Sequence, residues 1–116
     1  MKFHIDYDFD NWNEYIRKER SNKYWASNVK KKEIDIVRYS TIGMKYKGKY
    51  PIKITYLKYF KDKRQDLDNV RIKGIQDSLV KLGIIKNDNL NCIQEIVFKP
   101  IFSDEKIGID IIIEEI

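Results

Sequence analysis

The residues best suited to chemistry lie in the middle of the chain, in the segment Asp66-Leu67-Asp68-Asn69. Two carboxylates that are two residues apart repel each other, and a hard divalent cation such as Mg²⁺ relieves this repulsion. Such an ion polarises a phosphodiester, activates water and stabilises the leaving oxygen. The neighbouring Lys61, Lys63 and Arg64 would hold a phosphate backbone beside the ion. The segment is therefore a candidate site for metal-dependent cleavage of a phosphodiester.

The same segment also has a purely structural interpretation. Asp or Asn before a helix is ordinary capping, and acids in a first helical turn suit the helix dipole. Because Asp-x-Asp-Asn is a weak pattern, spacing alone favours capping over metal binding.

A second acidic point, Asp88, follows the helix predicted after Asp66-Asn69 and lies in the run Asn87-Asp88-Asn89. A helix of about fifteen residues is roughly 22 Å long. Asp88 therefore approaches Asp66 and Asp68 only if the chain doubles back or if a second subunit brings it there. Asn-Asp-Asn is also ordinary turn chemistry.

Lys73 lies in the second turn of that predicted helix. It can lean back toward the carboxylates, because helical side chains point N-terminally, and neutralise charge in a phosphoryl transition state. It can equally form an i,i+4 pair with Asp77. Both interpretations stay open.

Charge is distributed unevenly along the 116 residues, whose net charge is +5. Residues 11–64 hold 16 Lys/Arg against 5 Asp/Glu, whereas residues 65–116 hold 6 against 10. The basic part predicts long-range attraction to a polyanion. The candidate DNA-binding residues are Arg17, Arg20, Lys23, Lys30, Lys31, Lys61, Lys63 and Arg64.

Aromatic residues interleave with these cations, which allows stacking on unpaired bases. We predict core packing for Trp25 and surface or loop positions for Tyr46 and Tyr50. His4 falls on the polar side of an alternating strand, where a solvated side chain is expected.

Several classes of protein are excluded. No apolar run is long enough to span a membrane, and the aspartate-containing N-terminus does not resemble a signal peptide. Cys92 is the only cysteine, so an internal disulfide and a cysteine-rich metal site are ruled out, and a buried thiol is expected. These features favour a cytoplasmic location.

The elements that must position the acidic segment follow from hydrophobic periodicity. We predict a strand at Phe3–Tyr7, a helix capped by Asn11, a helix from Asn22 to about Arg38, a strand from Pro51 to Phe60, a helix ending at Gly83, and strands at Cys92–Ile101 and Lys106–Glu114. This order predicts one α+β domain over residues 1–116, with helices packed on a small mixed or antiparallel sheet.

The order of the motifs resembles a known family. Asp66-Leu67-Asp68-Asn69, Asp77-Ser78-Leu79, Leu82-Gly83-Ile84 and Asn87-Asp88 are similar to the C-terminal half of the RusA-like Holliday junction resolvases, which are crossover junction endodeoxyribonucleases. Asn13-Glu14-Tyr15-Ile16, Glu19-Arg20, Asn22-Lys23-Tyr24 and Lys30-Lys31 resemble the phage and prophage branch of that family.

The resemblance implies a homodimer that cleaves four-way DNA junctions with Mg²⁺. It implies that Asp66, Asp68 and Asp88 are catalytic carboxylates that bind the metal, assisted by a lysine in the following helix. The family lysine falls at Ile72 here, one residue before Lys73, and the family Asp-Asp pair is Asn87-Asp88. These departures keep an alternative open, a non-catalytic basic DNA-binding accessory protein of phage recombination or replication.

Overall fold

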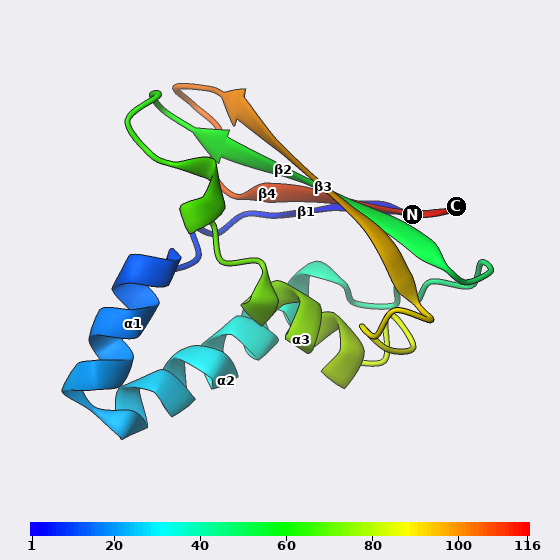
Figure 1. Cartoon of the computed structure of the whole chain (residues 1–116), viewed down its shortest axis with the longest axis horizontal. Helices are drawn as coiled ribbons and strands as arrows, with labels where there is room; N and C mark the ends of the chain where they lie inside the picture. The colour runs from blue at the N-terminus through cyan, green and yellow to red at the C-terminus, as the bar shows by residue number, and fades with distance from the viewer.

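The computed structural model describes all 116 residues. Its elements are β1 (Lys2–Ile5), α1 (Trp12–Ser21), α2 (Lys23–Ser40), β2 (Ile52–Phe60), the 3₁₀ helix η1 (Leu67–Asn69), α3 (Lys73–Lys81), β3 (Ile93–Phe102) and β4 (Ile109–Glu115). The three α-helices lie on one side of the sheet and none covers the other face (Figure 1). The predicted α+β class is confirmed.

The four strands form one mixed sheet in the order β1-β4-β2-β3. β4 pairs antiparallel with both β1 and β2, whereas β3 runs parallel to β2. The turn after β3 therefore does not close a hairpin, because β2 lies between β3 and β4. β1 and β3 are the edge strands, and the chain ends lie close together beside this sheet (Figure 1).

The core lies between the sheet and the helices. Alternate residues of β4, namely Ile109, Ile111 and Ile113, are buried because this strand has a neighbour on each side and helices on one face. They join Ile52, Ile54 and Tyr56 of β2 and Ile75 and Leu79 of α3 in one hydrophobic cluster. The strict alternation seen in the sequence is thus the inner face of a central strand.

Two predicted strands are shorter than expected. β1 ends at Ile5 rather than Tyr7, and β4 begins at Ile109 rather than Lys106. Gly108 explains both boundaries, because its φ is +95° and a Cβ there would collide with the carbonyl oxygen of Ile5. The chain bends at this glycine, so pairing between β1 and β4 stops at Ile5 and Ile109.

The helix predicted after the acidic segment is also shorter. α3 has only 9 residues, and the extended backbone at Val70 separates it from η1. Arg71 turns into the interior here instead of continuing a helix. The end is as predicted: Gly83 adopts φ +72° directly after the last helical turn.

An asparagine caps the N-terminus of each of the first two helices. Asn11 and Glu14 form a reciprocal capping box at α1, and the side chain of Asn22 accepts from the Tyr24 amide at the start of α2. The predicted cap at Asn11 is therefore confirmed. None of the helices combines the length and the apolar composition needed to cross a bilayer.

One prediction about an aromatic residue is wrong. Trp25 is 55% exposed, because the inner face of α2 passes through the adjacent Ala26 together with Glu33 and Val37. Tyr46 lies in the loop before β2, as predicted, but its ring is buried in the core and its hydroxyl donates to the Lys49 carbonyl at 2.8 Å. Helical phase and loop packing, rather than residue type, decide which ring is enclosed.

Candidate functional site

The acidic segment forms the turn between β2 and α3. Asp66 is the residue before η1 and makes no capping hydrogen bond, and Asp68 lies inside η1. α3 begins only at Lys73, with Ile72 in the capping position. Asp66 thus occupies the N-cap position of η1 without making a capping hydrogen bond, and Asp68 is an acid in the first turn of η1 rather than of α3.

Neither Asp66 nor Asp68 forms a side-chain hydrogen bond or an ion pair, and both are exposed. By contrast, five other aspartates are ion-paired with a lysine or arginine, at Asp8, Asp10, Asp35, Asp62 and Asp77, and Asp110 is bonded to His4. Free carboxylate oxygens two residues apart are the donor type that a hard cation binds. The chemistry of this pair therefore fits Mg²⁺.

Asn69 attaches the segment to the helices. Its side-chain oxygen accepts from the Asn13 amide of α1 at 3.3 Å. Since Asn69 is also the last residue of η1, this bond holds the acidic turn against the start of α1.

Asp88 lies beyond the far end of α3. Asn87 Oδ1 accepts from the amides of Asp88 and Asn89 at 2.7 and 3.2 Å, so Asn87 builds the turn and leaves the Asp88 carboxylate exposed. η1 precedes α3 and the Asp88 turn follows it (Figure 1). No group of three or more His, Cys, Asp and Glu residues within the chain is arranged to hold a metal ion. Within one chain, Asp88 therefore does not form a metal-binding group with Asp66 and Asp68.

Lys73 is the first residue of α3, not a residue of its second turn as predicted. Its amino group lies 3.5 Å from Asp77 Oδ1, and both side chains are more than half exposed. This is the i,i+4 pair. The family lysine position, Ile72, packs against the hydrophobic core instead.

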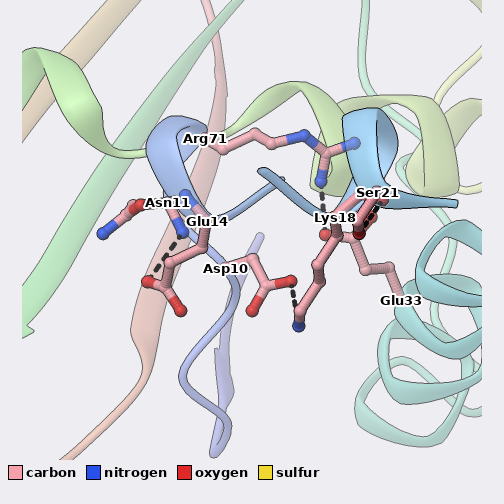
Figure 2. Close-up of polar contacts among 7 residues, drawn as sticks. All are labelled: Asp10, Asn11, Glu14, Lys18, Ser21, Glu33 and Arg71. Carbon is pink, nitrogen blue, oxygen red and sulfur yellow. Dashed lines mark hydrogen bonds and ion pairs between the residues drawn. The ribbon is translucent and has the colours of Figure 1, made fainter. Parts of the chain in front are cut away.

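A buried arginine holds the chain between η1 and α3. Arg71 Nη1 donates to Glu33 Oε2 of α2 at 2.6 Å, and the two residues are 4% and 3% exposed (Figure 2). The guanidinium also lies 3.8 Å from the ring centre of Tyr15 in α1. Burial raises the pKa of Glu33, although Arg71 acts in the opposite direction. Sequence reasoning missed this contact; a lone arginine between Val70 and Ile72 is its one local signal.

Gly74 is part of the same arrangement. A Cβ at this position would lie 2.6 Å from Glu33 Oε1 and 2.7 Å from Arg71 Nη1. The absence of a side chain therefore lets α3 approach the ion pair closely. Figure 2 shows that the Asp10–Lys18 pair and the Asn11–Glu14 box lie in the same region, at the start of α1.

A cleft of about 360 Å³ lies next to the acidic turn. Lys58, Lys61 and Lys106 line it, and so does Gln65, the residue before Asp66. Lys58 is paired with Asp8, whereas the amino group of Lys61 has no ion-pair partner. Three acids, Asp8, Glu14 and Asp62, also line the cleft, so a phosphate there would meet both amino and carboxylate groups beside the acidic turn.

The other predicted DNA-binding residues are exposed on α1, α2 and the turn after β2. Arg17 and Arg20 line a hollow of about 450 Å³, and Lys23, Lys30 and Lys31 form no ion pair. Arg64 donates to Asp62 at 2.7 Å and holds the pKa of that carboxyl below its usual range. Lys63 lies over the Phe102 ring.

His4 is not the solvated side chain that we predicted. It lies on the uncovered face of the sheet, 2.7 Å from Asp110, which also accepts from the Tyr59 hydroxyl at 2.7 Å. Burial raises the pKa of Asp110, but these two hydrogen bonds outweigh it and keep the pKa below its ordinary value. Cys92 is a free, buried thiol, as expected.

No family model matches the chain, and no curated protein does so either.

Proposed function

We propose that this chain is a Mg²⁺-dependent endodeoxyribonuclease of the RusA-like type, which cleaves four-way DNA junctions as a homodimer in the cytoplasm. The observation that carries the proposal is the position of Asp66 and Asp68, exposed and unpaired, immediately after Gln65 of a cleft to which Lys58, Lys61 and Lys106 contribute. The ordered resemblance over most of the chain supports the same activity.

Each part of the chain has a separate role in this mechanism. The cations of α1, α2 and the Lys61–Arg64 turn bind the phosphate backbone without reading sequence. Lys61 in the cleft positions one phosphodiester beside the acidic turn. Asp66 and Asp68 would hold Mg²⁺, which would supply the Lewis acidity and the activated water that hydrolysis needs. Asn69 and Arg71 keep the acidic turn in place.

Asp88 completes the set of catalytic carboxylates in this proposal. Since it lies past the far end of α3, it joins Asp66 and Asp68 across a subunit interface. Its free carboxylate, left exposed by the turn that Asn87 builds, is available for this contact. The proposed site is therefore incomplete without a second copy of the chain.

The test replaces one acid. Asp68→Asn removes a charge from the exposed turn without filling or emptying any buried space. We expect cleavage of a synthetic four-way junction in Mg²⁺ to fall by at least about 100-fold, since a metal-bound carboxylate contributes several kcal/mol to catalysis. Junction binding in EDTA should stay unchanged.

The matched control is Asp104→Asn, an exposed aspartate in the turn after β3 that lines no cleft and forms no ion pair. It should cleave as the original protein does. Normal cleavage by Asp68→Asn would refute the assignment of this residue.

A second candidate is a DNA-binding accessory protein without catalysis. Two departures from the family pattern favour it. Lys73 is paired with Asp77, and Asn87, which stands where the family has an acid, builds a turn. Purified protein that binds the junction but does not nick it, with Mg²⁺ or Mn²⁺ and at any salt concentration, would support this function.

A further inference from the structure

Trp25 is an exposed tryptophan that the fold does not use. It is 55% exposed and takes no part in the hydrophobic core cluster. The adjacent Ala26 turns inward and supplies the packing of this helical turn instead. A tryptophan ring left in water does not gain the free energy that its burial would supply, and a smaller residue at this position would lose less. The ring is therefore available to a ligand.

The surroundings of Trp25 are a small basic hollow. Lys18 of α1 and Trp25, Asn28, Val29 and Lys32 of α2 line a space of about 270 Å³. Residues 25, 28, 29 and 32 share one helical face because they are three, four and seven positions apart. The Lys32 amino group also lies 5.3 Å from the ring centre of Tyr7. Lys32 thus lines the hollow together with Trp25 and also lies over the ring of Tyr7.

Charge decides what kind of ligand suits the hollow. α1 and the part of α2 up to Lys32 carry seven cations, Arg17, Lys18, Arg20, Lys23, Lys30, Lys31 and Lys32, and of these only Lys18 is ion-paired. A planar apolar ring beside amino groups matches a nucleotide, whose base stacks while its phosphate binds a cation. A duplex does not expose the face of a base, so the base must be unpaired.

A lipid surface fits less well. A membrane-surface helix buries a continuous apolar face. Between the exposed Trp25 and Tyr39, α2 presents the polar residues Asn28, Lys31, Lys32 and Asp35 to solvent instead.

We propose that the Trp25 platform, made of Lys18, Trp25, Asn28 and Lys32, is a stacking site for one unpaired base of a DNA strand. The Lys32 amino group binds the phosphate of the same nucleotide. The proposal rests on the proposed function only in taking DNA as the polyanion. It assigns the protein a preference for DNA with unpaired bases that the acidic turn does not supply.

The experiment measures binding to a fluorescein-labelled oligothymidylate in EDTA, so that no cleavage takes place. Trp25→Leu should weaken this binding by about 5- to 150-fold, the range that loss of one base–aromatic stack produces. Its affinity for a fully paired, blunt-ended duplex of similar charge should not change. Tyr39→Leu, which removes an exposed ring at the other end of α2, is the matched control and should bind as the original protein does.

Fluorescence gives a direct second readout. The oligothymidylate should quench tryptophan emission of the original protein, and it should not quench Trp25→Leu, whose remaining tryptophan is Trp12. Equal urea midpoints for the two proteins would show that the substitution does not act through the fold.

Three outcomes would overturn the proposal. These are unchanged oligothymidylate affinity in Trp25→Leu, an equal loss of affinity for the blunt-ended duplex, or a loss of binding seen only with vesicles that contain phosphatidylserine. If the protein binds oligothymidylate through Trp25 but never cleaves a junction, only the proposed nuclease function is refuted, because the binding assay contains no metal.

Discussion

At the scale of single residues, the carboxylates of this protein fall into two groups. Asp66, Asp68 and Asp88 are exposed and accept no hydrogen bond, whereas Asp110 is buried and accepts from both Tyr59 and His4. A carboxylate with all its bonds made stabilises the fold, and one with free oxygens can bind a cation. The distinction separates candidate ligands from structural acids without reference to their spacing.

Asp110 predicts a specific loss of stability in acid. Its pKa is lowered in the folded protein, so its contribution is present above the unfolded pKa of about 3.9 and disappears as the pH falls through the folded pKa. Tyr59→Phe removes one of the hydrogen bonds that lower this pKa. We expect the variant to be about 0.5–1.5 kcal/mol less stable at neutral pH. It should also lose less stability than the original protein between about pH 5 and pH 2.

Urea unfolding at several pH values checks this expectation. Tyr39→Phe is the control, because the Tyr39 hydroxyl is exposed and makes no hydrogen bond. Parallel pH curves for Tyr59→Phe and the original protein would show that the hydrogen bond does not set the pKa of Asp110.

At the scale of elements, Arg71 links the segment before α3 to α1 and α2. It pairs with Glu33 of α2, lies over Tyr15 of α1, and precedes α3 by two residues. Glu33 Oε1 and Arg71 Nε have no protein hydrogen-bond partner, so the pair is incompletely satisfied. Such a pair contributes little net stability, but removing one partner leaves a buried charge uncompensated.

A double-mutant cycle tests this role. Arg71→Met should cost about 3–5 kcal/mol of unfolding free energy, because Glu33 stays buried without its partner. The double variant Glu33→Leu/Arg71→Met should recover most of that loss, since an apolar pair of similar volume can replace a buried ion pair. Urea denaturation of the two single variants and the double variant gives the coupling energy. Additive losses would contradict a shared ion pair.

At the scale of the whole molecule, the proposed site depends on two copies of the chain. The acidic turn lies before α3 and Asp88 lies after it, and no cluster of three potential ligands forms within one chain (Figure 1). If Asp88 acts at the site of its partner, a defect in Asp68 and a defect in Asp88 affect different sites of a mixed dimer.

Mixing two inactive variants tests this arrangement. Asp68→Asn and Asp88→Asn should each be inactive as homodimers. After unfolding and refolding together, about half of the molecules are mixed dimers, and each of these contains one site with all its acids intact. Junction nicking should therefore return in the mixture. No recovery, with mixed dimers demonstrated by differently tagged chains, would place all three acids in one subunit.

The local elements of this protein followed from its sequence because their causes are local. Alternation at Ile109, Ile111 and Ile113 specifies a strand with one buried face, and Asn11 with Glu14 specifies a helix start. The mixed α+β class followed from the order of these elements. The acidic segment and its basic neighbours were likewise visible as residue types.

Tertiary structure alone decided how these parts are used. It placed β2 between β3 and β4, exposed Trp25, enclosed Tyr46, and paired Arg71 with a glutamate 38 positions away. Each outcome depends on contacts between residues distant in the chain, and local periodicity carries no information on which partner a residue meets. For the same reason the sequence identified Asp66 and Asp68 as candidate ligands, but only the fold showed that neither side chain makes a capping hydrogen bond.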